Sequence, residues 1–186
     1  MIYIGIDPGL TGAVAVLYGE VREPVVYDLP VVAVSGGVVQ NEVSGARLIT
    51  LLRSIPAAAA GKVVVERTGP MPKQGVVSMF SMGCTRGTIL TALAAVGVAP
   101  FEVWPQQWKW HFKLIGAGKD RSLELARELF PSLAAHLHLA KHHNRAEALL
   151  LAEYLRLGMP GATAPGSAPR KRRKRLKADD YVEIAP

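Results

Sequence analysis

The chain has 186 residues, 49% of them hydrophobic, which suits one domain of ordinary size with a sizeable core. Its formal net charge of +7 and pI of about 9.8 indicate a polyanionic partner without identifying it. The single cysteine, Cys84, excludes an intramolecular disulfide and a cysteine-based zinc site, and it favours a reducing compartment.

The chain begins with a predicted hairpin. Residues 1–7 alternate in polarity and predict a strand that ends at Asp7, and the turn at Pro8 and Gly9 leads into a second apolar run over 13–18. No basic leader precedes the first strand, and the apolar runs around 31–39 and 90–100 are too short to cross a bilayer. We therefore expect a cytoplasmic protein that is not bound to a membrane.

The remaining elements alternate between strand and helix. Further strands are expected over 21–29, 62–66 and 99–104, and helices over 41–55, 76–96, 106–112, 122–130 and 143–157. An antiparallel start followed by strands separated by helices predicts an α/β fold. Its mixed five-stranded sheet has antiparallel first strands and is flanked by helices.

Residues 159–186 differ in composition from residues 1–158. Pro, Gly, Ala and Ser dominate first, and seven of the eight residues over 170–177 are then cationic. We expect a folded domain over 1–158 and a linker with a basic tail over 159–186. A solvated tail without a role is the alternative to nucleic-acid binding. The predicted contacts there are Arg170, Lys171, Arg172, Arg173, Lys174 and Arg175.

Three carboxylates occupy places that favour chemistry. Asp7 and Glu66 each end a predicted strand, and a rigid strand fixes the side chain at its end. The apolar residues before each carboxylate favour burial, which makes an ionised group there costly. Glu147 lies near the start of the last helix, on the face that continues toward the sheet. If the two strands are neighbours, the acids converge and can hold two Mg²⁺ or Mn²⁺ ions for phosphodiester hydrolysis. Three unrelated solvent-facing acids are the alternative.

The sequence resembles the RuvC-type Holliday junction resolvases of the ribonuclease-H-like superfamily, especially members carried by phages. The similar stretches are residues 4–9 with Thr11 and Gly12, the strand 63–66, and residues 145–152; segments 75–80, 104–109 and 118–120 are similar to the phage members. The resemblance implies a ribonuclease-H-like fold and a homodimer that cuts four-way DNA junctions by paired symmetric nicks. It also implies that Asp7, Glu66 and Glu147 form the metal site.

The resemblance implies a fourth active-site residue just upstream of Glu147. The candidates are His142, His143 and Asn144, which occupies the usual position of this residue in bacterial members. We favour His143 as a catalytic residue and metal ligand, because an imidazole can contact metal or water whereas an amide is a poor base.

The resemblance also implies DNA contacts. Family members use two lysines to contact the scissile phosphate. Lys109 matches one of these positions, and Lys119 or Arg121 matches the other. In the family an apolar residue on the loop after the second carboxylate wedges into the junction, and Met71 is the candidate here. Further backbone contacts are expected from Arg67, Lys73 and Arg86. The predicted helix over 76–96 is the candidate dimer interface.

Three alternatives remain open from the sequence. Residues 7–12 also resemble the phosphate loop of sugar kinases and actin-like ATPases, although 186 residues leave no room for a second nucleotide-binding half. A ribonuclease H-type or general branched-DNA nuclease would use the same acids. A catalytically inactive junction-binding protein is disfavoured by the presence of all three carboxylates.

Overall fold

A five-stranded mixed sheet forms the centre of the computed structural model, which describes residues 1–19, 23–37, 39–55, 61–70 and 73–159. Its strand order is β3-β2-β1-β6-β7. The strands are β1 (Tyr3–Asp7), β2 (Ala13–Leu17), β3 (Val25–Asp28), β6 (Lys62–Glu66) and β7 (Phe101–Val103). β1, β2 and β3 pair antiparallel, whereas β6 and β7 extend the sheet in parallel, so the predicted sheet is confirmed.

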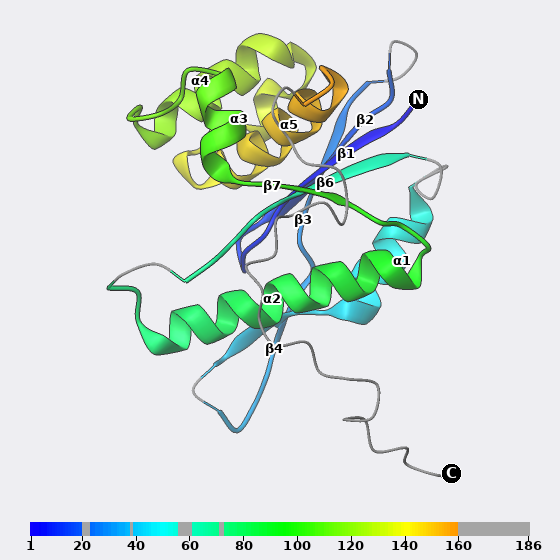
Figure 1. The fold of residues 1–186 in the computed structure, drawn as a ribbon, viewed down its shortest axis with the longest axis vertical. Helices are drawn as coiled ribbons and strands as arrows, with labels where there is room; N and C mark the ends of the chain where they lie inside the picture. The colour runs from blue at the N-terminus through cyan, green and yellow to red at the C-terminus, as the bar shows by residue number, and fades with distance from the viewer. Residues whose placement is uncertain (20–22, 38, 56–60, 71–72, 160–186) are drawn as a thin grey trace, which may run out of the picture.

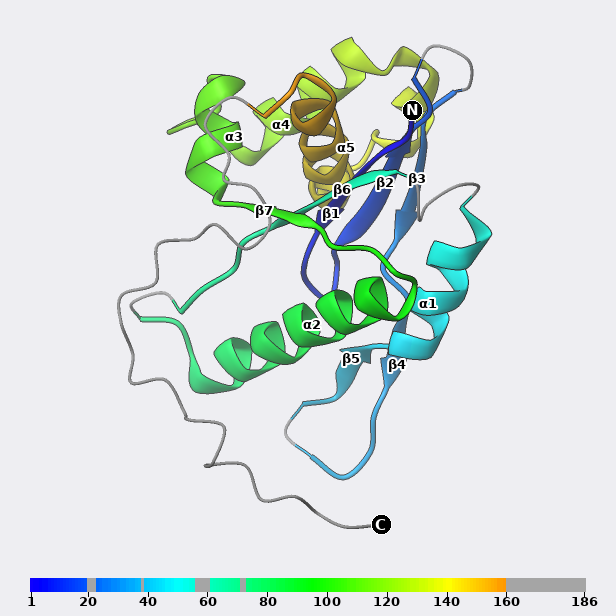
Figure 2. The ribbon, with the colours of Figure 1, turned by 45° about the vertical axis from the view of Figure 1, so that its right-hand side comes forward.

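Helices cover both faces of the sheet (Figure 1). On one side lie α3 (Pro105–His111), α4 (Lys119–Leu129), α5 (His143–Arg156) and two short 3-10 helices over Pro131–His136 and Ala140–His142. On the other side lie α1 (Gly45–Ser54), α2 (Val76–Ala95) and a small antiparallel pair, β4 (Val31–Ala33) and β5 (Asn41–Val43) (Figure 2). The sheet therefore separates two hydrophobic layers.

Alternation along the strands divides the core. Ile4 and Ile6 face α1 and α2, where they pack with Leu48, Leu52 and Leu93. The opposite face of β2 presents small side chains to α5 and α4, and Val64 of β6 packs with α3 and α5. The central strands are buried on both faces, which explains their nearly continuous apolar sequence.

Gly5 seats α5 directly on the sheet. A Cβ atom at this position would lie 2.2 Å from the Ala148 carbonyl oxygen and 2.4 Å from the Ala152 nitrogen. Only glycine permits this approach of the helix backbone to β1. Because Ala148 follows Glu147, the same contact fixes the height at which Glu147 stands above the sheet.

The predicted helix over 41–55 is wrong at its start. Asn41–Val43 pairs with β4 as β5, and α1 begins only at Gly45, after Ser44, whose Oγ accepts from the Arg47 nitrogen at 3.4 Å.

A second difference concerns α2, whose 20 residues are long and apolar enough to cross a membrane by length and composition alone. That property alone is weak evidence for a membrane span, because core helices of soluble proteins share it.

Candidate active site and metal centre

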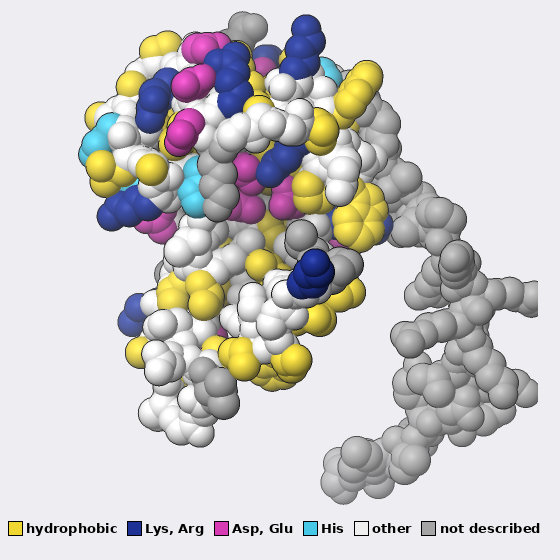
Figure 3. Space-filling model, turned by 90° about the vertical axis from the view of Figure 1, so that its left-hand side faces the viewer, with side chains coloured by type: hydrophobic (Ala, Val, Ile, Leu, Met, Phe, Trp, Pro, Cys, Tyr) yellow, Lys and Arg dark blue, Asp and Glu magenta, His cyan; other side chains and the backbone are white. Residues whose placement is uncertain are grey.

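Asp7 and Glu66 leave the sheet side by side. β1 and β6 run in parallel with Ile6 opposite Val65, so the next residue of each strand emerges at the same edge. Asp7 is 6% exposed and Glu66 is 9% exposed. Figure 3 looks onto this edge and shows acidic side chains in the hollow between the two layers, with basic side chains near its rim.

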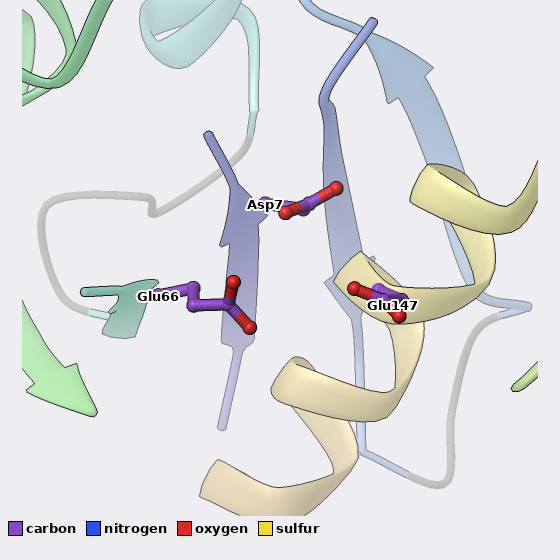
Figure 4. Close-up of side chains that lie close together, drawn as sticks. All are labelled: Asp7, Glu66 and Glu147. Carbon is purple, nitrogen blue, oxygen red and sulfur yellow. The ribbon is translucent and has the colours of Figure 1, made fainter. Parts of the chain in front are cut away.

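Glu147 completes the cluster from the first turns of α5. One ligand oxygen from each of Asp7, Glu66 and Glu147 lies within 4.8 Å of the other two. The three carboxylates point toward one another from two strands and a helix (Figure 4). Among the described residues this is the one group of three or more acidic, histidine or cysteine side chains close enough to hold a metal ion.

The cluster carries more negative charge than its surroundings neutralise. Burial raises the pKa of Asp7 well above its ordinary value, and the charges of Glu66 and Glu147 raise it further, while Lys109 opposes them. Burial likewise raises the pKa of Glu66 to about 7, against the hydrogen bond from Trp108. Buried oxygen donors short of positive charge fit a hard divalent cation.

Two adjacent residues of α3 contact two of the carboxylates. Trp108 is fully buried, and its Nε1 donates to Glu66 Oε2 at 2.7 Å. Lys109 Nζ lies 2.9 Å from Glu147 Oε1 and 5.0 Å from the centre of the Trp108 ring. Sequence reasoning found Lys109 but missed Trp108. The available signal was an aromatic residue beside that lysine, because a buried indole N–H needs an acceptor.

The structure does not bring His143 into the carboxylate cluster. Its Nδ1 lies 3.2 Å from the Ala140 carbonyl oxygen. Asn144 Nδ2 donates to the backbone oxygen and to Oγ1 of Thr11, at 2.8 and 2.6 Å, and so ties α5 to the loop that follows Asp7. His142 is buried, and its Nδ1 accepts from the Leu139 nitrogen at 3.3 Å. The ligand role of His143 therefore stays a prediction.

The predicted DNA contacts lie in different surroundings. Arg67 and Arg86 both pair with Glu102 of β7, and the Arg67 guanidinium lies 5.4 Å from the Trp104 ring. Arg121 pairs with Glu124 and Glu128 on the surface of α4.

Lys73 is exposed on the loop before α2, and the backbone of Lys119 begins α4. Met71, the tail residues 170–175 and the rest of the predicted tail after Met159 lie outside the described residues.

The fold resembles that of solved RuvC structures. RuvC of Thermus thermophilus in complex with Holliday junction substrate matches with a TM-score of 0.53 at 19% identity, over 88% of this chain and all of that one. A second Thermus thermophilus RuvC structure gives a TM-score of 0.48 at 20% identity over the same shares. The chain has the ribonuclease-H-like fold of RuvC.

A sequence relative points to the same proteins. The chain is 31% identical over 181 residues to the Holliday junction resolvase MOC1, chloroplastic, of Chlamydomonas reinhardtii. The match covers 87% of this chain and 20% of the relative, so the chain spans about a fifth of that protein's length. No protein-family model matches the chain. The RuvC-like fold and the similarity to a Holliday junction resolvase both agree with the resemblance found in the sequence.

Proposed function

We propose that the chain is a metal-dependent DNA endonuclease that resolves four-way junctions by paired symmetric nicks. The observation that carries this proposal is the convergence of Asp7, Glu66 and Glu147 at one buried sheet edge. The similarity to a Holliday junction resolvase and the basic net charge support branched DNA as the substrate. The single cysteine supports action in a reducing, cytoplasmic compartment.

The three carboxylates would hold two Mg²⁺ ions, for which Mn²⁺ can substitute. All three residues offer oxygen donors, and the excess negative charge of the cluster would be relieved by divalent cations. Bound ions would supply an activated water and stabilise the leaving oxygen of phosphodiester hydrolysis.

The protein's own residues position these groups. Trp108 fixes the orientation of Glu66, Gly5 sets the seat of α5 and hence of Glu147, and Asn144 holds the loop after Asp7. Lys109, whose Nζ lies 2.9 Å from Glu147 Oε1, would contact the scissile phosphate. His143 remains our candidate for a fourth active-site role.

The remaining DNA contacts are proposed from charge. We assign backbone contacts to cations around the site and in the tail, and the wedge to Met71. The cations are Lys73, Lys119, Arg67, Arg86, Arg121 and residues 170–175.

A homodimer through α2 would supply the second active site that paired nicks require. Val76, Val77 and Phe80 near the start of α2 are 81%, 47% and 64% exposed, an apolar surface that supports self-association. Replacement of Phe80 with Glu should convert dimer to monomer in sedimentation experiments. A wild-type chain that sediments as a monomer at high concentration would refute this part of the proposal.

Cleavage of a labelled four-way junction tests the proposed activity. Two symmetric nicks are expected with Mg²⁺, and Glu66→Gln should abolish them while junction binding persists. The matched control is Glu42→Gln, an exposed residue of β5. Preferential cutting of an RNA–DNA hybrid or of linear duplex would favour another nuclease of this fold. Binding without any nick in Mg²⁺ or Mn²⁺ would favour an inactive junction binder.

A further inference from the structure

Lys109 acts as a resident counter-cation in the carboxylate cluster. Its Nζ lies 2.9 Å from Glu147 Oε1, and the two side chains are 28% and 14% exposed. The buried ring of Trp108 lies beside the same ammonium group, at 5.0 Å. Lysine usually extends its charge into solvent, so an ammonium held among buried acids is an unusual arrangement.

The ion pair uses the carboxylate that a metal ion needs. Glu147 is one of the three acids whose ligand oxygens lie within 4.8 Å of one another. A divalent ion bound at Glu147 would stand within roughly 4 Å of the lysine ammonium, a distance at which the two positive charges repel each other. Lys109 and a metal ion therefore compete for Glu147.

The charges of the cluster favour binding of the two divalent ions in two stages. With all three carboxylates ionised, as metal binding requires, the cluster and Lys109 together carry two negative charges, which a single divalent ion neutralises. A second divalent ion would add two uncompensated positive charges unless an anion arrived with it. A phosphodiester is such an anion, and lysine is a suitable point-charge partner for it.

Only the side chain of Lys109 needs to move. Its backbone belongs to α3, and its carbonyl oxygen accepts from the Leu114 nitrogen at 2.7 Å. The flexible four-carbon stem can swing the ammonium between partners without a change of fold.

We propose that Lys109 blocks the Glu147 side of the metal site in the free protein, and that a DNA phosphate draws it away so that a second metal ion can bind. The inference rests on the proposed function, because it takes the scissile phosphate as the new partner. It predicts that metal and DNA bind cooperatively, since each displaces the same ion pair.

Calorimetric titration of the full chain with Mg²⁺ alone tests the competition without DNA. Lys109→Met should bind Mg²⁺ at least about tenfold more tightly than the wild type, because a nearby positive charge is removed. Lys109→Arg keeps the charge and should bind like the wild type. The matched control is Lys62→Met, which removes an equal charge at the opposite end of β6, roughly 13 Å from Glu66. Equal or weaker binding by Lys109→Met would overturn the proposal, whether or not the protein cuts DNA.

A second measurement tests the coupling to DNA. Fluorescence anisotropy gives the affinity for a four-way junction with and without Ca²⁺, and denaturing gels verify that the strands stay intact. Ca²⁺ should strengthen junction binding by a larger factor in the wild type than in Lys109→Met. Identical factors would refute the coupling. A wild type that binds no junction at all would instead refute the proposed function, while the Mg²⁺ titration would still decide whether Lys109 competes with metal.

Discussion

Replacement of Glu66 with Gln should stabilise the metal-free protein at neutral and alkaline pH. Glu66 is 9% exposed, and burial raises its pKa to about 7, with Trp108 as its hydrogen-bond donor. Glutamine has nearly the same shape, and its Oε1 can still accept from Trp108 Nε1. The substitution therefore removes a poorly neutralised buried charge without opening a cavity or breaking the hydrogen bond.

The magnitude follows from the difference between the folded and unfolded states. The pKa of Glu66 is about 7 in the folded protein against 4.5 for the ordinary group, and each unit corresponds to about 1.4 kcal/mol. Because the folded pKa is the higher one, the wild type loses stability as the pH rises from 4.5 through 7. The loss reaches roughly 3 kcal/mol above pH 7 and is under about 1 kcal/mol at pH 5.

Urea unfolding in EDTA at pH 8 and pH 5 measures this effect. The free energy of unfolding of Glu66→Gln should exceed that of the wild type by roughly 3 kcal/mol at pH 8 and by much less at pH 5. The exposed control Glu42→Gln should have the wild-type value at both pH values. Mg²⁺ at a thousandfold excess over Kd should reverse the order of stability, because only the wild type retains the complete site and gains about 4.1 kcal/mol. A Glu66→Gln protein no more stable than the wild type at pH 8 without metal would refute the reasoning.

Three further predictions concern other parts of the molecule. Gly5→Ala should lower the free energy of unfolding by about 3 kcal/mol or more and abolish cleavage, because a Cβ atom would overlap the backbone of α5; urea unfolding and junction cleavage measure both. Trp108→Phe should lower the free energy of unfolding by about 1–3 kcal/mol, because it leaves Glu66 without its hydrogen-bond donor. It should also raise the pKa of Glu66 further, so that Mg²⁺ binding, followed by calorimetry, disappears at a higher pH than in the wild type as the solution is acidified. Deletion of residues 170–177 should reduce the slope of log affinity against log salt by roughly 0.9 for each phosphate that the tail neutralises; an unchanged slope would show that the tail does not touch DNA.

Local patterns were sufficient to predict the strands that carry the site. The alternation that ends at Asp7 and the compact apolar run that ends at Glu66 each identify a strand and the carboxylate at its end. Their convergence follows once the two strands are parallel neighbours, because parallel strands end at the same edge. Glu147 was predictable for a similar reason, since helical spacing places it on the face of α5 that meets the sheet.

Interactions between distant segments limited the prediction elsewhere. Asn41–Val43 is too short to identify as a strand by its own pattern, and it becomes one by pairing with β4. The contact between Trp108 and Glu66 joins residues 42 positions apart, and no periodicity predicts it. His143 was favoured on its chemistry, but the direction of a side chain in the first turn of a helix depends on the preceding backbone. Here the Ala140 carbonyl oxygen lies next to its ring.

Gly5 shows how the fold and the site depend on one contact. A glycine in the middle of a central strand weakens the strand, since it contributes no side chain and loses more conformational freedom on folding than other residues. In this protein its place on β1 is where α5 crosses the sheet at backbone distance. A larger residue would force α5 outward and carry Glu147 away from Asp7 and Glu66. The spacing of the three acids is therefore set by a residue without a functional group. Strand propensity alone would favour a different residue at this position.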